Sequence, residues 1–159
     1  MIQRVKSASV RVDGELVSEI GRGLLVLVGI HKYDTNEERN NLVRKILNLR
    51  AFEDPSSEEE KKRWNKSVLD LDLEVLLVSQ FTLIHSMKGN KPDFRHAMAG
   101  EKAKEFFDSF VQEMKKNHKN GDLVKEGKFG AMMDVQLIND GPVTLQLEFA
   151  PKQPKELSQ

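Results

Sequence analysis

An apolar run near the start of the chain decides the fold class: residues 24–30, Leu24-Leu25-Val26-Leu27-Val28-Gly29-Ile30. The run is short and rich in branched side chains, which predicts a strand that is buried on both faces. Residues 73–78 form a second run of this kind, Leu73-Glu74-Val75-Leu76-Leu77-Val78. We therefore expect two strands whose faces are both covered by other parts of the chain.

Half-buried strands are predicted on either side of these runs. Apolar and polar side chains alternate over residues 8–12, Asp13-Gly14 forms a tight-turn signal, and residues 15–20 follow as a second strand. The same alternation marks residues 133–137 and 143–149 near the C-terminus. All four segments are typical of strands with one polar face.

Two amphipathic helices are predicted between the strands. Thr35 and Glu38 have capping-box spacing, which predicts the start of a helix of about 14 residues. Residues 53–66 and 85–95 are rich in polar residues, glycine and proline and are predicted to be loops. The second helix is marked by apolar residues at three- and four-residue spacing: Ala103, Phe106, Phe107, Phe110, Val111 and Met114.

This order of elements predicts one α+β domain at residues 1–150. We expect a mostly antiparallel sheet or partial barrel that is covered by two main helices. Residues 151–159 have no periodicity and are predicted to form a loose C-terminal tail.

The composition excludes several kinds of chemistry. The chain has 159 residues and no cysteine, which excludes disulfides, thiol nucleophiles, thiolate zinc sites and iron–sulfur clusters. Glycine loops for phosphate, nucleophile elbows and dinucleotide fingerprints are missing, so we expect no metal and no cofactor. The four histidines lack metal-ligand spacing and are predicted at the surface: His31, His85, His96 and His118.

The chain also lacks signs of membrane targeting. It opens without a hydrophobic signal region, and its longest apolar run is too short to span a bilayer. We expect a soluble, cytoplasmic protein that has no membrane partner.

The net charge is zero, with 25 Lys+Arg and 25 Asp+Glu, which argues against a nucleic-acid ligand. The charges are distributed unevenly, however. Residues 1–50 carry nine basic and six acidic side chains, and residues 85–128 carry ten and seven. Two readings stay open: a cationic face on a neutral protein, and charges of both signs scattered over the surface.

Two stretches break the strand patterns. Residues 139–144, Asn139-Asp140-Gly141-Pro142-Val143-Thr144, contain an Asp-Gly pair that suits an ordinary hairpin turn. The proline removes a backbone donor, and X-Pro bonds adopt cis at a small cost, which would orient the carbonyl groups differently.

Residues 79–82, Ser79-Gln80-Phe81-Thr82, end a buried strand. They suit a cap of a neighbouring element, or a site in which backbone N–H groups and Thr82 face a carbonyl oxygen.

The two stretches together resemble the paired signature of the D-aminoacyl-tRNA deacylases, also called D-tyrosyl-tRNA deacylases. The similarity extends from about Ile2 to Glu148, with the motifs in the expected order and spacing. Supporting stretches are Ile2–Val5, Arg44–Arg50, Lys88–Phe94 and Gly127–Gly130. The acidic loop at residues 53–63 is the part least similar to the family.

The resemblance implies the fold of this family and a homodimeric enzyme that proofreads translation. Its members hydrolyse the ester bond of D-aminoacyl-tRNA and of mischarged glycyl-tRNA. Gly141 and Pro142, joined by a cis bond, would reach into the partner subunit's site and collide with the side chain of an L-amino acid. Arg4 would brace this turn.

The resemblance also implies roles for residues of the same subunit. Phe129 and Met133 would contact the terminal adenosine. The local basic charge, rather than the resemblance, indicates that segments such as Lys88–Arg95 and Lys115–Lys128 would contact phosphates of the acceptor end. The segment that holds the ester carbonyl would be Ser79, Gln80, Phe81 and Thr82.

Alternatives remain at two levels. Thr82 could act as a nucleophile, or the 2′-hydroxyl of the terminal ribose could activate water. We favour the second, because no base stands near Thr82 in the sequence. At the level of function, the alternatives are a non-catalytic nucleic-acid-binding module on the same fold and a hydrolase of small D-amino-acid esters.

Overall fold

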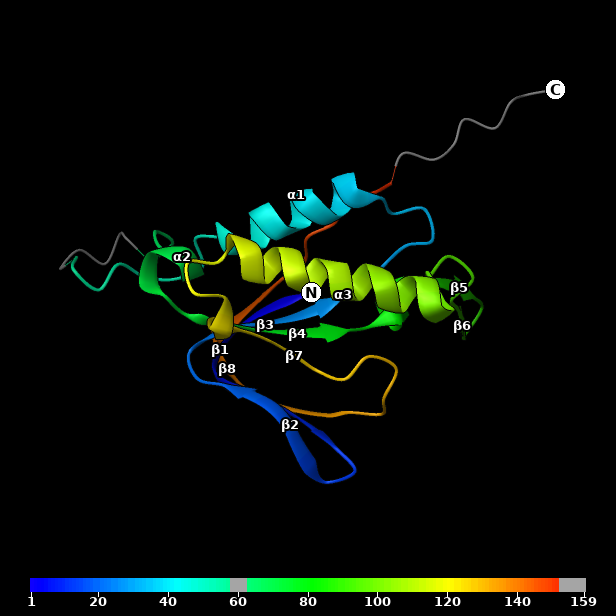
Figure 1. Cartoon of the computed structure of the whole chain (residues 1–159), viewed down its shortest axis with the longest axis horizontal. Helices are drawn as coiled ribbons and strands as arrows, with labels where there is room; N and C mark the ends of the chain where they lie inside the picture. The colour runs from blue at the N-terminus through cyan, green and yellow to red at the C-terminus, as the bar shows by residue number, and fades with distance from the viewer. Residues whose placement is uncertain (58–62, 152–159) are drawn as a thin grey trace.

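The computed structural model describes residues 1–57 and 63–151, and its centre is a six-stranded sheet (Figure 1). Neighbouring strands follow the order β2 (Glu15–Ile20), β1 (Ile2–Val12), β3 (Gly23–Val28), β4 (Glu74–Ser79) and β7 (Val124–Glu126), and β8 (Asp134–Leu145) pairs with β1. β1 is antiparallel to β2, β3 and β8, whereas β3–β4 and β4–β7 are parallel. The predicted α+β class with a mostly antiparallel sheet is confirmed.

Strand β1 bends the sheet because its two halves pair with different strands on one edge. Residues 2–5 pair with β3 and residues 8–12 pair with β2, while β8 follows the opposite edge. The curled sheet encloses a small cluster of buried side chains, which explains the expectation of a partial barrel: Val5, Ala8, Val10, Ile20, Leu25, Leu76 and Val78.

The two apolar runs are buried on both faces, as predicted, because alternate residues belong to different clusters. Leu25 and Leu76 point into the curled sheet, and Leu24 and Leu77 face the cluster beneath the helices. Burial of such side chains is the main stabilising term of a domain of this size.

Helices α1 (Asn36–Leu47) and α3 (Gly100–Asn117) lie side by side over one face of the sheet (Figure 1). The capping box is present at the start of α1, where Thr35 and Glu38 bond reciprocally. The sequence did not predict the short helix α2 (Val68–Leu71), which is preceded by the N-cap residue Ser67 and a second capping box.

The predicted hairpin turn at residues 139–144 is wrong. β8 stays paired with β1 on both sides of this stretch, with Gln3 opposite Thr144 and Val5 opposite Asn139. Arg4 therefore lies opposite residues 140–143, which loop out of the strand. The C-terminal segment after Leu145 is not a strand, contrary to the prediction for residues 143–149.

Two further expectations need correction. The loop predicted at residues 85–95 contains a short hairpin, β5 (Ser86–Lys88) and β6 (Lys91–Asp93). His118 is buried rather than at the surface. Its ring can be buried because Nε2 has a hydrogen-bond partner in the carbonyl oxygen of Leu73, 3.0 Å away. The predicted tail beyond Pro151 and part of the loop at residues 53–66 lie outside the described residues.

The close approach of β3 and β4 depends on glycine at position 23. A Cβ atom there would lie 1.9 Å from the backbone oxygen of Glu74. We predict that Gly23→Ala lowers the free energy of unfolding by at least about 2 kcal/mol, since the two strands must separate to admit the methyl group. Urea unfolding measures this.

Gly21 provides the matched control. A Cβ atom at Gly21 would lie 3.5 Å from the Glu74 side chain, which is ordinary contact. Gly21→Ala should change the free energy of unfolding by no more than about 0.5 kcal/mol. Equal losses in the two variants would contradict the role of the close approach.

Candidate active site

The segment Ser79–Thr82 lies where the buried strand β4 ends. Ser79 is the last residue of β4 to pair with β3, opposite Val28, and the N–H of Gln80 donates to the carbonyl oxygen of Val28 at 2.8 Å. The chain then turns into the short 3₁₀ helix η2 (Phe81–Leu83). The sheet thus fixes the start of the segment, and the helical turn directs the rest of it away from the sheet.

Contacts within the segment orient Thr82. The side-chain amide of Gln80 donates a hydrogen bond to the Thr82 hydroxyl oxygen. The backbone oxygen of Thr82 lies 2.8 Å from Nδ1 of His85. Ser79, Gln80 and Thr82 are half-buried, whereas the ring of Phe81 is 57% exposed.

The β5–β6 hairpin stands next to Phe81. The ring of Phe94, which follows β6, meets the ring of Phe81 edge-on at a centroid distance of 5.1 Å. Asp93 binds Arg95 and Lys88, which holds the pKa of the Asp93 carboxyl well below its usual range. The hairpin is therefore a cationic element with a fixed aromatic side chain at its base.

Phe129 and Met133 lie on the segment that follows β7. The N–H of Gly127 donates to the carbonyl oxygen of Leu77 at 2.9 Å, so this segment runs past the end of β4. Phe129 packs on Phe107 of α3, at a ring-centroid distance of 5.8 Å, and Met133 packs against the cluster inside the curled sheet. Both side chains are half-buried but contact different clusters.

Gly141 and Pro142 lie at the exposed edge of the loop in β8, and the peptide bond between them is cis. Arg4 donates to the backbone oxygens of Asp140 at 3.2 Å and of Ala51 at 2.7 Å, and its guanidinium lies 3.4 Å from the Asp140 carboxylate. These contacts tie the loop to β1 and to the chain after α1.

Other side chains complete the surroundings of this loop. The side-chain oxygen of Asn139 accepts the N–H of Val143 at 2.9 Å, across the Gly-Pro pair. The ring of Trp64 lies 5.7 Å from the Arg4 guanidinium carbon and is 58% exposed. No pattern in the sequence singles out Trp64, because only the folded chain brings it to Arg4.

Within one chain the two motifs are apart. Val5 pairs with both Gly23 and Asn139, whereas Ser79 pairs with Val28 at the other end of β3. The loop lies opposite Arg4, which pairs with Leu24, four residues before Val28. At about 3.3 Å per residue, roughly 13 Å along β3 therefore separates the level of the Gly-Pro loop from that of Ser79. A single subunit does not bring these residues together.

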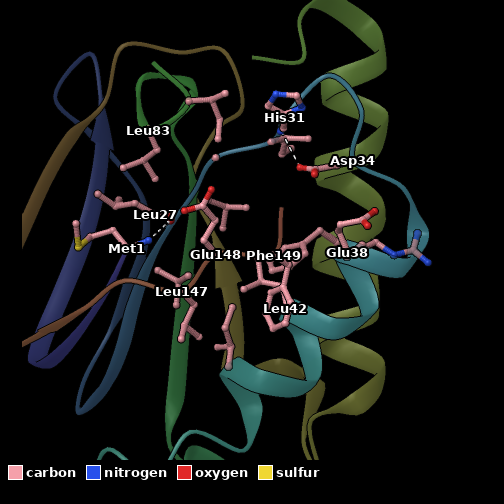
Figure 2. A pocket seen from close by; sticks show the side chains of 18 of the residues that line it. Met1, Leu27, His31, Asp34, Glu38, Leu42, Leu83, Leu147, Glu148 and Phe149 are labelled. Atoms are coloured by element: carbon pink, nitrogen blue, oxygen red, sulfur yellow. Dashed lines mark hydrogen bonds between the residues drawn. The ribbon is translucent and has the colours of Figure 1, made fainter. Parts of the chain in front are cut away.

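A cavity of about 250 Å³ lies beside the Ser79–Thr82 segment rather than on it (Figure 2). It is bounded by the end of β3, by α1 and α3, and by residues 146–151, and it shares Leu83 with η2. Figure 2 shows Asp34, Glu38 and Glu148 at the cavity together with His31 and apolar side chains such as Leu27, Leu42 and Phe149.

Among the titratable groups that line this cavity, Asp34 has the clearest shift in pKa. Burial raises the pKa of its carboxyl to about 6, although one carboxylate oxygen accepts the N–H of His31 at 2.7 Å. The other oxygen is buried without a hydrogen-bond partner among the described residues. Burial, followed by the neighbouring His96 and Lys32, lowers the pKa of His31.

The raised pKa of Asp34 predicts a pH dependence of stability. An acid whose pKa is higher in the folded state stabilises the fold below its unfolded pKa, near 3.8, and this contribution is lost as the pH rises through about 6. Asp34→Asn cannot ionise, so its stability relative to the wild type should increase between pH 4 and pH 7. The full shift corresponds to about 3 kcal/mol, and screening at a half-buried group reduces our expectation to about 1 kcal/mol.

Thermal unfolding of both proteins across this pH range measures the effect. Asp134→Asn is the control, because Asp134 is exposed. A stability difference between Asp34→Asn and the wild type that stays constant from pH 4 to pH 7 would contradict the prediction.

The described residues show neither a metal centre nor a membrane-spanning helix. Within residues 1–57 and 63–151, no group of three or more His, Asp or Glu residues lies in position to hold a metal ion. No helix in the same ranges is long and apolar enough to cross a membrane.

Comparison with known proteins shows the family. A family model described as D-Tyr-tRNA(Tyr) deacylase matches residues 1–148. The chain is 52% identical to human D-aminoacyl-tRNA deacylase 1, over 99% of this chain and 76% of that protein. It is 56% identical to D-aminoacyl-tRNA deacylase of Drosophila melanogaster, over 93% of this chain and 90% of that protein.

Solved structures match the fold of this chain. The structure of a protein named c-Myc DNA Unwinding Element Binding Protein has a TM-score of 0.87 and 53% identity, and the match covers 94% of this chain and 97% of the other. A probable eukaryotic D-amino acid tRNA deacylase, 18% identical, matches the fold with a TM-score of 0.76 over 89% of this chain and 93% of its own. The family model and these curated relatives place the chain in the class of enzymes that hydrolyse ester bonds. The chain belongs to the D-Tyr-tRNA(Tyr) deacylase family.

Proposed function

We propose that this enzyme hydrolyses the ester bond of D-aminoacyl-tRNA and of mischarged glycyl-tRNA. The products are the free amino acid and tRNA, and L-aminoacyl-tRNA is rejected. The observation that carries the proposal is that both family motifs are present and surface-accessible, at two distant places on one chain. We assign the enzyme to proofreading in translation, in the cytoplasm, where aminoacyl-tRNA is consumed.

The Ser79–Thr82 segment suits the role of holding the ester carbonyl. Phe81 and Thr82 are the first residues of a helical turn, so their backbone N–H groups have no partner within that turn. N–H groups in such a position stabilise the negative charge that develops on a carbonyl oxygen during attack by water. Gln80 orients the Thr82 hydroxyl beside them.

The Gly141–Pro142 loop supplies the chirality filter from a second copy of the chain. Its carbonyl oxygens would accept hydrogen bonds from the α-amino group, and its edge would collide with an L side chain. Because the loop is exposed and held by Arg4 and Asn139, it is available to a second copy in a defined shape. This arrangement requires a homodimer in which each loop enters the site of the other subunit.

The acceptor end of tRNA would lie across the Ser79–Thr82 end of the sheet. Phe129 and Met133 would contact the terminal adenosine. The cationic hairpin and the basic residues between Lys115 and Lys128 would contact phosphates, giving an affinity that decreases with salt. Several of these cations already pair with carboxylates, which suits a modest affinity: Lys88 and Arg95 with Asp93, Lys115 with Glu126, and Lys125 with Glu74.

For the chemical step we favour activation of water by the 2′-hydroxyl of the terminal ribose. A nucleophilic Thr82 would need a base at its hydroxyl. The Thr82 hydroxyl instead accepts a hydrogen bond from the Gln80 amide, and His85 contacts the backbone oxygen of Thr82. This geometry supports Thr82 as a group that binds the ester rather than one that attacks it.

Ester loss from defined aminoacyl-tRNAs tests the function. Purified enzyme should deacylate D-tyrosyl-tRNA and glycyl-tRNA, and should act on L-tyrosyl-tRNA at least about 100-fold more slowly, because the L side chain collides with the loop. The ethyl ester of D-tyrosine is the control for non-specific esterase activity. Equal rates on the D and L substrates would overturn the proposal, and rapid cleavage of the ethyl ester would favour a hydrolase of small esters.

Thr82→Ala tests the mechanism. If water attacks directly, the variant should retain substantial turnover, with a loss of about tenfold for one lost contact to the carbonyl oxygen. Single-turnover deacylation of D-tyrosyl-tRNA measures the rate, and a gel-shift assay measures binding. Complete loss of turnover with binding intact would identify Thr82 as the nucleophile.

A nucleic-acid-binding module is the second candidate. It is favoured by the solved structure with 53% identity, because the name of that protein describes it as one that binds a DNA unwinding element. The deacylation assay separates the two functions, because a module would bind tRNA or DNA without any loss of ester.

A further inference from the structure

We propose that Phe94 is a positioning residue, which holds Phe81 and thereby joins the cationic hairpin to the segment that binds the ester. The inference rests on the proposed function and adds a residue that acts on the site through its neighbour. It also gives the hairpin a second role besides contact with phosphate.

The core does not support the ring of Phe81. Its ring is 57% exposed and belongs to neither buried cluster. The ring of Phe94 meets it at 5.1 Å with an interplanar angle of 79°, which is the edge-to-face arrangement that aromatic pairs prefer. Phe94 is therefore a specific contact for a ring that the core does not hold.

Backbone and side-chain hydrogen bonds hold Phe94 itself in place. The preceding residue, Asp93, accepts the backbone N–H of Arg95 at 3.1 Å and its Nε at 2.7 Å. The carbonyl oxygen of Phe94 accepts the N–H of Ala97 at 3.0 Å, and the N–H of Met98 donates to the carbonyl oxygen of Ile30 at 2.8 Å. Phe94 thus lies on a turn that is tied to the chain following β3.

The position of the Phe81 ring bears on the segment that would bind the ester. Phe81 begins the turn whose N–H groups would face the ester carbonyl, so a ring that changes position would disturb the direction of those groups. Misplacement of a catalytic donor lowers the rate of the chemical step more than it weakens binding of the ground state. Phe94 should consequently affect kcat, whereas the lysines of the hairpin should affect KM for tRNA.

The experiment compares two substrates and two substitutions. D-tyrosyl-tRNA presents phosphates to the hairpin, and 3′-O-D-tyrosyl-adenosine does not. Phe94→Leu retains an apolar side chain of similar size but removes the ring, and Phe94→Tyr retains the ring. We expect Phe94→Leu to lower kcat about three- to tenfold on both substrates. Phe94→Tyr should have a kcat close to that of the wild type.

Two control variants separate the effect of the Phe94 ring on Phe81 from other changes in the same hairpin. Met87→Ala changes an exposed apolar side chain of the same hairpin and should leave kcat unchanged. Lys91→Gln should raise KM for D-tyrosyl-tRNA alone. The inference would be overturned if Phe94→Leu left kcat unchanged, or if Phe94→Leu changed only KM and only for the tRNA substrate.

A readout without turnover separates this inference from the proposed function. The ring protons of Phe81 should shift in the NMR spectrum of Phe94→Leu, because the ring current of Phe94 is removed, and Phe94→Tyr should keep them near their wild-type positions. Absence of D-specific hydrolysis by the wild type would overturn the function. Unchanged Phe81 signals in Phe94→Leu would overturn the positioning role.

Discussion

Backbone pairing along both edges of β1 is the constraint on which the rest of the structure depends. One edge is shared between β3 and β2, and the other carries β8 over most of its length. This pairing curls the sheet and encloses the smaller cluster. It also places Arg4 opposite the residues that loop out of β8, and it places β4 two strands away. Because each backbone N–H and C=O in such a sheet needs a partner, neither motif can move without breaking pairs.

Both motifs lie where this pairing stops. Ser79 is the last residue of β4 to pair with β3, and the Gly-Pro loop fills the gap between two paired regions of β8. In each case a regular strand holds the flanking residues, so the exposed backbone has a defined direction without being covered. A site that recognises its substrate through backbone groups needs both properties, since ordered groups avoid the entropic cost of becoming ordered when the substrate binds.

The sequence predicted those features that neighbouring residues determine. The apolar runs predicted β3 and β4, the capping box predicted the start of α1, and the apolar spacing predicted α3. It did not predict that β8 is continuous, because an Asp-Gly pair between alternating segments has the local pattern of a hairpin. Only pairing with β1, far away in the sequence, decides otherwise. The burial of His118 likewise depends on the carbonyl oxygen of Leu73, and no local pattern indicates that contact.

The same distinction applies to the charges of the hairpin. Counting charges in the sequence finds a cationic stretch on a neutral chain. The structure adds that Asp93 pairs with two cations of this stretch. Asp93 binds Lys88 on one strand and Arg95 beyond the other, so the carboxylate reduces the net charge while it fixes the turn that carries Phe94. Exposed ion pairs of this kind contribute little to stability. The contribution of Asp93 is instead geometric, because it orders cations and an aromatic ring beside the Ser79–Thr82 segment while leaving the overall charge of the enzyme near zero. An enzyme that must release tRNA after each turnover needs this balance, since every additional unpaired cation would strengthen the binding of substrate and product alike.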